Sequence, residues 1–168
     1  MIKKLNLLLI ILWMILVFSF SNQTSTKSSG LSGKLTTKIV NVLHITEGCS
    51  EEDSKIVISN IEHIIRKVAH YSIYALGGFL IYFEMSLYKI PFKIKLPATQ
   101  LIGTIYACTD EMHQSFVPGR SAEIRDVIID SCGIFAGIIV ATIVLLIIDK
   151  IVAQMNSRKK INKVMEEK

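Results

Sequence analysis

Three short clusters of charged, histidine and amide side chains are the residues of this sequence best suited to chemistry. Carboxylates and imidazoles exchange protons, while lysine and arginine bind anions such as phosphate through charge-assisted hydrogen bonds. Each cluster lies at one end of a long apolar block, so the packing of the helices that carry these blocks decides whether the clusters meet. In chain order the clusters are Lys67, His70 and Tyr74; Asp110, Glu111, His113 and Gln114; and Arg120, Asp126 and Asp130.

The first cluster shares one face of a predicted helix, because residues three and four positions apart are neighbours on a helix surface. Basic and aromatic residues are common where a membrane helix meets water, and such a belt is the structural explanation for this cluster. Histidine is not a usual member of the belt. His70 therefore stays open between a structural and a functional role.

The second cluster closes an apolar block with two adjacent acids, Asp110 and Glu111. A carboxylate within a membrane costs ~2.5–3.5 kcal/mol on insertion scales unless it is paired or reaches water. If the membrane ended at Cys108, the acids would be solvated cap residues, but the block would then be too short to span. We therefore expect a polar cavity here, with Asp110, His113 and Gln114 on one helix face.

The third cluster follows a Pro-Gly turn and opens the last apolar block. Asp126 and Asp130 lie one turn apart, on the face that continues through Gly133 and Gly137. Small residues four apart let helices pack closely, so this face should meet another helix and both aspartates should point into the bundle. Buried carboxylates need counter-charges, which the basic residues of the clusters supply. The alternative is an ion-pair network that only holds the helices in register.

The apolar residues that must position these clusters are concentrated in four blocks. The chain has 168 residues, of which 51% are hydrophobic. Roughly 20 residues cross the ~30 Å hydrocarbon core of a bilayer. The sequence therefore predicts an all-α, four-transmembrane-helix bundle as one domain over residues 1–148, followed by a basic tail over residues 149–168. The predicted spans are residues 5–20, 68–88, 96–116 and 124–148.

Between the first and second blocks lies an amphipathic outer segment. Residues 21–33 are rich in Ser, Thr and Gly and predict a flexible linker, while apolar residues at helical spacing over 35–43 predict a short helix on the bilayer surface. Ser50, followed by Asp53, predicts the start of the next helix. The first block also resembles a signal peptide, but bulky Trp13 and the absence of an Ala-x-Ala site favour a retained anchor.

Loop charges predict which way the bundle faces. Lysines and arginines gather before the first block, between the second and third, and after the fourth. The positive-inside rule places these three regions in the cytoplasm, so both termini are cytoplasmic and the polar clusters face outward in a multi-pass cell-membrane protein. The net charge of +5 follows from these loops, which argues against a nucleic-acid partner. The bilayer is the predicted partner, and oligomers remain open.

Sequence motifs for known catalytic centres are missing. The histidines and carboxylates lack zinc-site spacing, so we predict neither a metal nor another cofactor. There is no Gly-x-Ser-x-Gly motif and no P-loop. Whether the protein is an enzyme is left open.

The clusters nevertheless resemble the signature of VanZ-like membrane proteins. The similarity covers residues 5–145, and the entry to the second block and the end of the first are also similar. The resemblance implies a four-helix protein of the bacterial cell envelope, linked to low-level resistance to glycopeptides, particularly teicoplanin. The central motif is Asp110-Glu111-x-His113-Gln114-x-Phe116-x-Pro118-Gly119-Arg120, followed by Asp126-Val127 and Gly133.

The sequence thus supports a hypothesis of binding or modifying an outer-leaflet anionic lipid or lipid-linked cell-wall precursor. Arg120 and Lys67 would hold an anionic headgroup, and Glu111, Asp110 and His70 would transfer protons. The other members of the clusters would line the substrate site or orient the basic residues. They are Tyr74, His113, Gln114, Asp126 and Asp130.

Two hypotheses from other classes compete. A non-catalytic scaffold would use the Gly133/Gly137 face and the outer segment to recruit an envelope partner protein. A small carrier would need polar residues along the whole depth of the bundle, whereas the cytoplasmic halves of the blocks are apolar. We therefore rank the carrier last.

Overall fold

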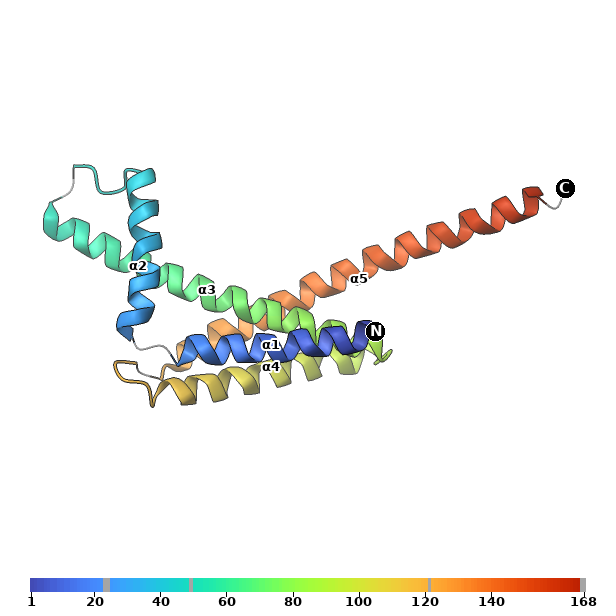
Figure 1. Ribbon diagram of the computed structural model, residues 1–168, viewed down its shortest axis with the longest axis horizontal. Coiled ribbons are helices and arrows are strands. Elements are labelled where there is room, and N and C mark those ends of the chain that lie inside the picture. The colour runs from blue at the N-terminus through green and yellow to red at the C-terminus, as the bar shows by residue number, and fades with distance from the viewer. Residues whose placement is uncertain (23–24, 49, 121, 167–168) are drawn as a thin grey trace.

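The computed structural model describes residues 1–22, 25–48, 50–120 and 122–166. Over these residues the regular structure is entirely helical, which confirms the predicted all-α class (Figure 1). The helices are α1 (Ile2–Ser21), α2 (Ser25–Val42), α3 (Glu51–Leu87), α4 (Phe92–Gln114) and α5 (Ile124–Glu166).

Helices α1, α3, α4 and the first half of α5 form the bundle, in which α3 and α5 run parallel and α1 and α4 run antiparallel to them (Figure 1). Hydrogen bonds show the direction of α1. Asn6 Nδ2 donates to the Leu80 carbonyl at 3.1 Å, and Trp13 Nε1 donates to the Ile73 carbonyl at 2.7 Å. The lysine-rich connection between α3 and α4 therefore lies at the same end of the bundle as the N-terminus.

The contact between α3 and α5 is the closest in the bundle and depends on glycine. A Cβ atom on Gly137 would lie 1.9 Å from the Ala75 carbonyl oxygen, and one on Gly133 would lie 2.4 Å from that of Tyr71. In return, a Cβ on Gly78 would lie 2.3 Å from the Ile134 carbonyl oxygen. The prediction that the small-residue face of the last helix meets another helix is confirmed, and that helix is α3.

The core beside this contact is aromatic and aliphatic. Trp13 of α1 is 4% exposed and meets Tyr74 of α3 edge-on, with ring centroids 6.0 Å apart. Tyr106 of α4 packs against both rings and donates a hydrogen bond to the Met14 carbonyl at 2.9 Å. These contacts make α1 an integral part of the bundle.

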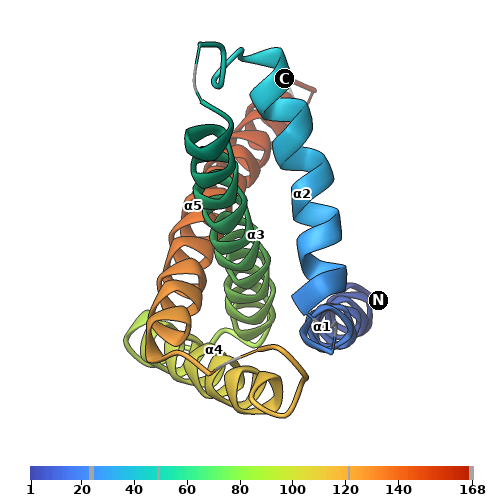
Figure 2. The ribbon, with the colours of Figure 1, turned by 90° about the vertical axis from the view of Figure 1, so that its left-hand side faces the viewer.

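Helix α2 crosses the other helices at a steep angle and packs against α3 (Figures 1 and 2). It begins at Ser25, so the prediction of a flexible linker over residues 21–33 is wrong from that position on. Threonine hydroxyls donate back to carbonyls one turn earlier, as from Thr36 to Ser32 at 2.9 Å, and α3 buries Thr36 and Val40. Packing on α3 thus overrides a weak helical composition.

The start of α3 agrees with the sequence. The Ser50 side chain accepts a hydrogen bond from the Asp53 backbone N–H at 3.1 Å, as predicted for an N-cap. From there α3 continues without a break through the predicted second span. Helix α5 likewise continues past residue 148 to Glu166.

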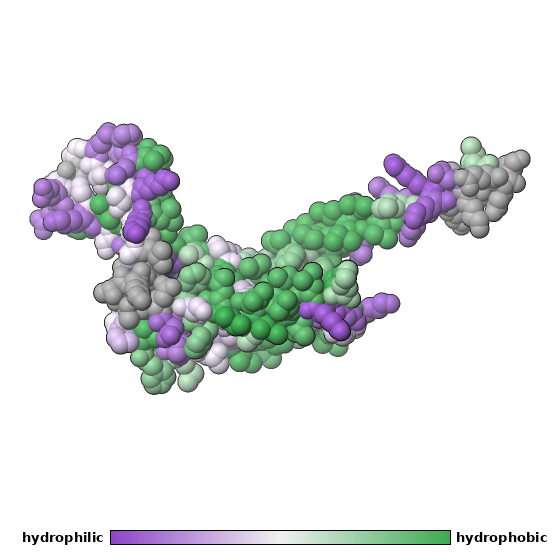
Figure 3. Space-filling view, in the orientation of Figure 1, coloured by the Kyte–Doolittle hydropathy of each residue, from purple (hydrophilic) through white to green (hydrophobic). Residues whose placement is uncertain are grey.

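Within the described residues, two helices are long and apolar enough to cross a membrane, Ile2–Ser21 and Ile124–Lys159. The predicted four-span bundle is therefore not confirmed. Helices α3 and α4 carry too many polar side chains, and several of these are buried inside the bundle, such as Thr99, Asp110 and Gln114. Exposed leucine, isoleucine and valine side chains form an apolar surface along the bundle and α5, with polar surface at both ends (Figure 3).

The α3–α5 contact gives a first prediction. Gly137→Ala should destabilise the protein by about 1–3 kcal/mol, because the added Cβ overlaps the Ala75 carbonyl and forces the helices apart. The matched control is Gly30→Ala in α2, where a Cβ meets nothing within 4 Å. Thermal unfolding of the purified protein in detergent should show a lower midpoint for Gly137→Ala and an unchanged or higher midpoint for Gly30→Ala. Equal midpoints would contradict the close contact.

Candidate functional site

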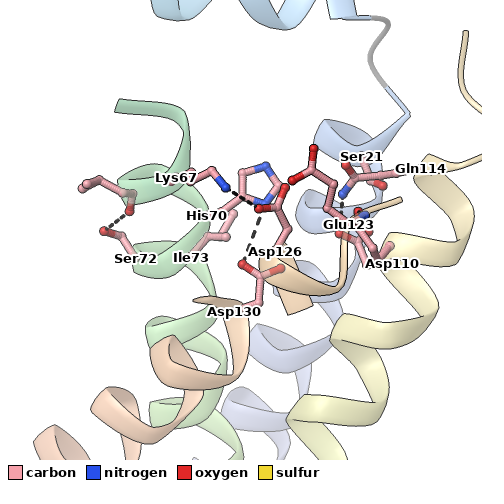
Figure 4. A network of polar contacts seen from close by, with 12 residues as sticks. Ser21, Lys67, His70, Ser72, Ile73, Asp110, Gln114, Glu123, Asp126 and Asp130 are labelled. Atoms are coloured by element: carbon pink, nitrogen blue, oxygen red, sulfur yellow. Dashed lines mark hydrogen bonds and ion pairs between the residues drawn. The ribbon is translucent and has the colours of Figure 1, made fainter. Parts of the chain in front are cut away.

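Polar side chains from α3, α4 and α5 converge at the end of the bundle where α3 and α5 enter it (Figure 4). Lys67 Nζ donates a hydrogen bond to Asp126 Oδ1 at 2.7 Å. One turn further in, His70 Nδ1 lies 3.8 Å from Asp130 Oδ1. This distance is that of an ion pair and is too long for a direct hydrogen bond. One hydrogen-bonded ion pair and one longer contact thus join α3 to α5.

A second chain of contacts joins the end of α4 to α1 (Figure 4). Gln114 Nε2 donates to Asp110 Oδ2 at 3.0 Å, and Arg120 Nη1 donates to Gln114 Oε1 at 2.8 Å. The same Arg120 nitrogen lies 3.5 Å from the Ser21 carbonyl at the end of α1. Gly119, with φ of 79°, supplies the left-handed backbone conformation that turns the chain back before Arg120.

Glu111 has a structural contact. Its buried carboxylate accepts a hydrogen bond from the Glu123 backbone N–H at 2.6 Å. Glu123 directly precedes α5, where the first N–H groups of a helix lack partners within it. The carboxylate therefore anchors the connection from α4 to α5.

A polar cavity of ≈ 140 Å³ opens between α3, α5 and the loop before α5. A water molecule needs only ~10–15 Å³ of such space, so several water-sized groups or a phosphate fit. Both basic and acidic side chains line it, and the acidic ones belong to α5 and to Glu123 directly before it. The lining residues are His63, Arg66, Lys67, His70, Gln114, Gly119, Arg120, Glu123, Asp126, Ile129 and Asp130.

An apolar cavity of ≈ 260 Å³ adjoins it, between α1, α2 and α3. Arg66, His70 and Arg120 line both cavities, so these three side chains form the boundary between them. The remaining walls are mainly aliphatic and aromatic. They are Val17, Phe20, Ser21, Ser32, Leu35, Ile65, Ala69, Ile73, Tyr74 and Asp110.

Arg120 is the least compensated cation at this boundary. In the described part of the chain its guanidinium forms no ion pair and donates only to the neutral oxygens of Gln114 and Ser21. Burial lowers the pKa of Arg120, and the nearby Arg66 guanidinium lowers it further, against the opposing effect of Asp110 and Glu111. Arg66 itself pairs with Glu62 at 3.4 Å. Two guanidiniums therefore face one boundary.

The structure brings most of the predicted site residues to these cavities. Asp130 is 1% exposed and points into the bundle as expected, and Asp126 is partly buried against Lys67. Glu111 and His113 line neither cavity. The His113 ring instead stacks on Phe18 of α1, with centroids 4.6 Å apart.

Some members of the site were not singled out from the sequence. His63 lies four residues before Lys67 and seven before His70, so the helical repeat was a signal that placed it on the same face. Ser21 contributes through its backbone carbonyl, which no side-chain pattern reveals. Across the described residues, no three His, Cys, Asp or Glu side chains are grouped so as to hold a metal ion.

The Lys67–Asp126 pair gives a prediction that concerns stability. Lys67→Met, Asp126→Asn and the double variant form a thermodynamic cycle, and the two changes should couple by roughly 0.5–3 kcal/mol, since the pair is partly buried and in direct contact. Denaturation of the four proteins in mixed micelles measures the coupling. The exposed pair of His44 and Glu47 is the control and should show almost no coupling. Equal coupling in both pairs would refute a special role for Lys67–Asp126.

One of the comparisons with known proteins identifies a family. No curated protein and no solved structure shows a significant match to the chain. The model of the VanZ/LLP1 family matches residues 6–146, which include most of α1, all of α3 and α4, and every residue that lines the two cavities. The chain therefore belongs to the VanZ/LLP1 family.

Proposed function

We propose that this chain is a multi-pass protein of the bacterial cell membrane whose polar cavity binds the phosphate-bearing headgroup of an outer-leaflet lipid or lipid-linked cell-wall precursor. Family membership and the two candidate membrane-spanning helices support residence in the envelope. Through this binding the protein would contribute to low-level resistance to glycopeptides such as teicoplanin. That part of the proposal comes from the resemblance to VanZ-like proteins.

The observation that carries the proposal is the pair of guanidiniums at the cavity boundary. Arg66 and Arg120 come from different segments and line the same two cavities, although like charges repel. A phosphate between them would relieve the repulsion and accept hydrogen bonds from both, since guanidinium forks match phosphate geometry. Lys67 adds a third cation, which Asp126 orients at 2.7 Å.

Proton transfer within the cavities would fall to His70 and Asp110. His70 lies at the boundary and is positioned by Asp130, and Asp110 lines the apolar cavity. Glu111 would contribute only by holding the chain next to Asp110 in place, because its carboxylate accepts a hydrogen bond from the backbone of Glu123. The proposed primary activity is therefore binding, and any reaction would depend on His70 and Asp110.

The scaffold hypothesis receives less support. It used both the Gly133/Gly137 face and the amphipathic outer segment to recruit a partner protein. That face is covered by α3, which approaches it so closely that a single Cβ atom has no room. A partner would have to displace α3, so headgroup binding is the function that the geometry favours.

The proposed topology has four spans, with α3 and α4 crossing the membrane beside α1 and α5. The alternation of directions in the bundle fits this proposal, since α1 and α4 run opposite to α3 and α5. In this arrangement the lysine-rich ends of the helices lie at one end of the bundle and the cavities lie at the other. The positive-inside rule then makes the cavity side the outer one.

Cysteine labelling in intact cells tests this orientation. In a variant without native cysteines, Pro118→Cys should react with a membrane-impermeant maleimide, while Lys93→Cys and Ser157→Cys should react only after the cells are opened. All three positions are exposed on the protein, so access depends on the membrane. The reverse pattern would place the cavities in the cytoplasm and end the proposal of an outer-leaflet ligand.

Headgroup binding gives a second test. The purified chain in neutral detergent should bind phosphatidic acid in preference to phosphatidylcholine, and Arg120→Gln should weaken that binding roughly tenfold or more, for a loss of about 1.5–3 kcal/mol in charge-assisted hydrogen bonds. Lys159→Gln, on the exposed far part of α5, is the matched loss of one charge and should bind normally. Ligand-dependent thermal shifts measure both. Equal binding by Arg120→Gln and the unaltered chain would exclude this headgroup site.

A further inference from the structure

We propose that the apolar cavity between α1, α2 and α3 holds the first part of the hydrocarbon chain of the bound lipid, so that the site recognises a lipid phosphate as one amphiphilic molecule. This inference rests on the proposed function, because it takes the phosphate to lie at the polar cavity. It adds a second binding element and a ligand class, namely long-chain lipids with a phosphate headgroup.

The two cavities are arranged as the two halves of an amphiphile require. Arg66, His70 and Arg120 belong to both, so a group held by the arginines from the polar side is already at the entrance of the apolar side. Most of the other walls of the apolar cavity are hydrocarbon, from Val17 of α1 to Ile73 of α3. A hydrocarbon chain from the equally apolar bilayer would be held by these walls through van der Waals packing.

The size and the opening of the cavity indicate how much of the chain it holds. Its ≈ 260 Å³ lies just below the ~300–1,000 Å³ of usual small-molecule pockets, so it takes a short chain segment and not a whole lipid. Phe20 and Leu35 line it and are still 48% and 49% exposed. The mouth therefore lies between α1 and α2, and the rest of the chain leaves there onto exposed apolar side chains of α1.

Helix α2 supplies one wall and is tied to the cationic boundary. Ser32 Oγ donates a hydrogen bond to Glu62 Oε1 at 2.9 Å, and the same carboxylate oxygen pairs with Arg66 at 3.4 Å. Thus Ser32 of α2 and Arg66 contact the same carboxylate on α3, that of Glu62. The amphipathic segment outside the bundle thereby gains a function, since it covers the place where the hydrocarbon chain would enter.

Filling the apolar cavity tests the inference. Ala69 lines the apolar cavity and not the polar one, so Ala69→Phe should block the chain and spare the phosphate. Binding of phosphatidic acid to the purified full chain should weaken by about tenfold, because the excluded chain loses its packing contacts with the cavity walls. Binding of inorganic phosphate, followed by phosphorus NMR, should not change. Ala153→Phe on exposed α5 is the matched control and should leave both ligands unaffected.

The outcomes separate this inference from the proposed function. If Arg120→Gln weakens both ligands while Ala69→Phe changes neither, the headgroup site stands and the chain site is overturned. If Arg120→Gln changes neither ligand, the proposed function itself fails. Leu35→Trp narrows the same cavity from α2. It controls for the possibility that Ala69→Phe acts by disturbing α3. If both cavity-filling variants weaken the two ligands equally, the chain inference is wrong, and a selective loss of phosphatidic acid in either one supports it.

Discussion

The close approach of α3 to α5 is the constraint on which the rest of the structure depends. Three glycines remove the Cβ atoms that would hold the helices apart, with clearances as short as 1.9 Å between an added Cβ and the opposing backbone. Such a contact fits in one register only, because any slide places a side chain against the backbone. Since the helices are parallel, the register continues outward and places Lys67 opposite Asp126 and His70 opposite Asp130.

This register also determines which charges at the polar end have a partner. Asp126 is hydrogen-bonded to Lys67, Asp130 lies 3.8 Å from His70, and Glu111 accepts a hydrogen bond from the backbone before α5. Arg120 is then left with neutral oxygens, within the described chain, at the boundary of two cavities of opposite character. Arg120 is partly buried, and taking a charge out of water without full compensation is costly. The ligand that we propose for this boundary is an anion with an apolar neighbour.

The sequence predicted those features that depend on local patterns. The all-α class, the cap at Ser50, the packing face through Gly137 and the burial of Asp130 all follow from spacing within one helix. Features that depend on how separate segments meet were not predictable in this way. The contact of Glu111 needs the loop before α5 to fold back, and the ring of His113 finds its partner on α1. The helical start of α2 likewise depends on packing against α3.

The way in which separate helices meet also explains why hydropathy does not support α3 and α4 as membrane spans. A hydropathy average counts every polar residue as a cost of membrane burial, whichever way its side chain points. In α3 and α4 the polar residues include members of the site, such as His70 and Gln114. Asp110 and Gln114 are buried against protein and hydrogen-bonded to each other. Helices that line a polar cavity must fall short on such a scale. The four-span proposal and the binding proposal therefore depend on the same side chains, and evidence for a ligand at Arg120 would also explain why α3 and α4 carry them.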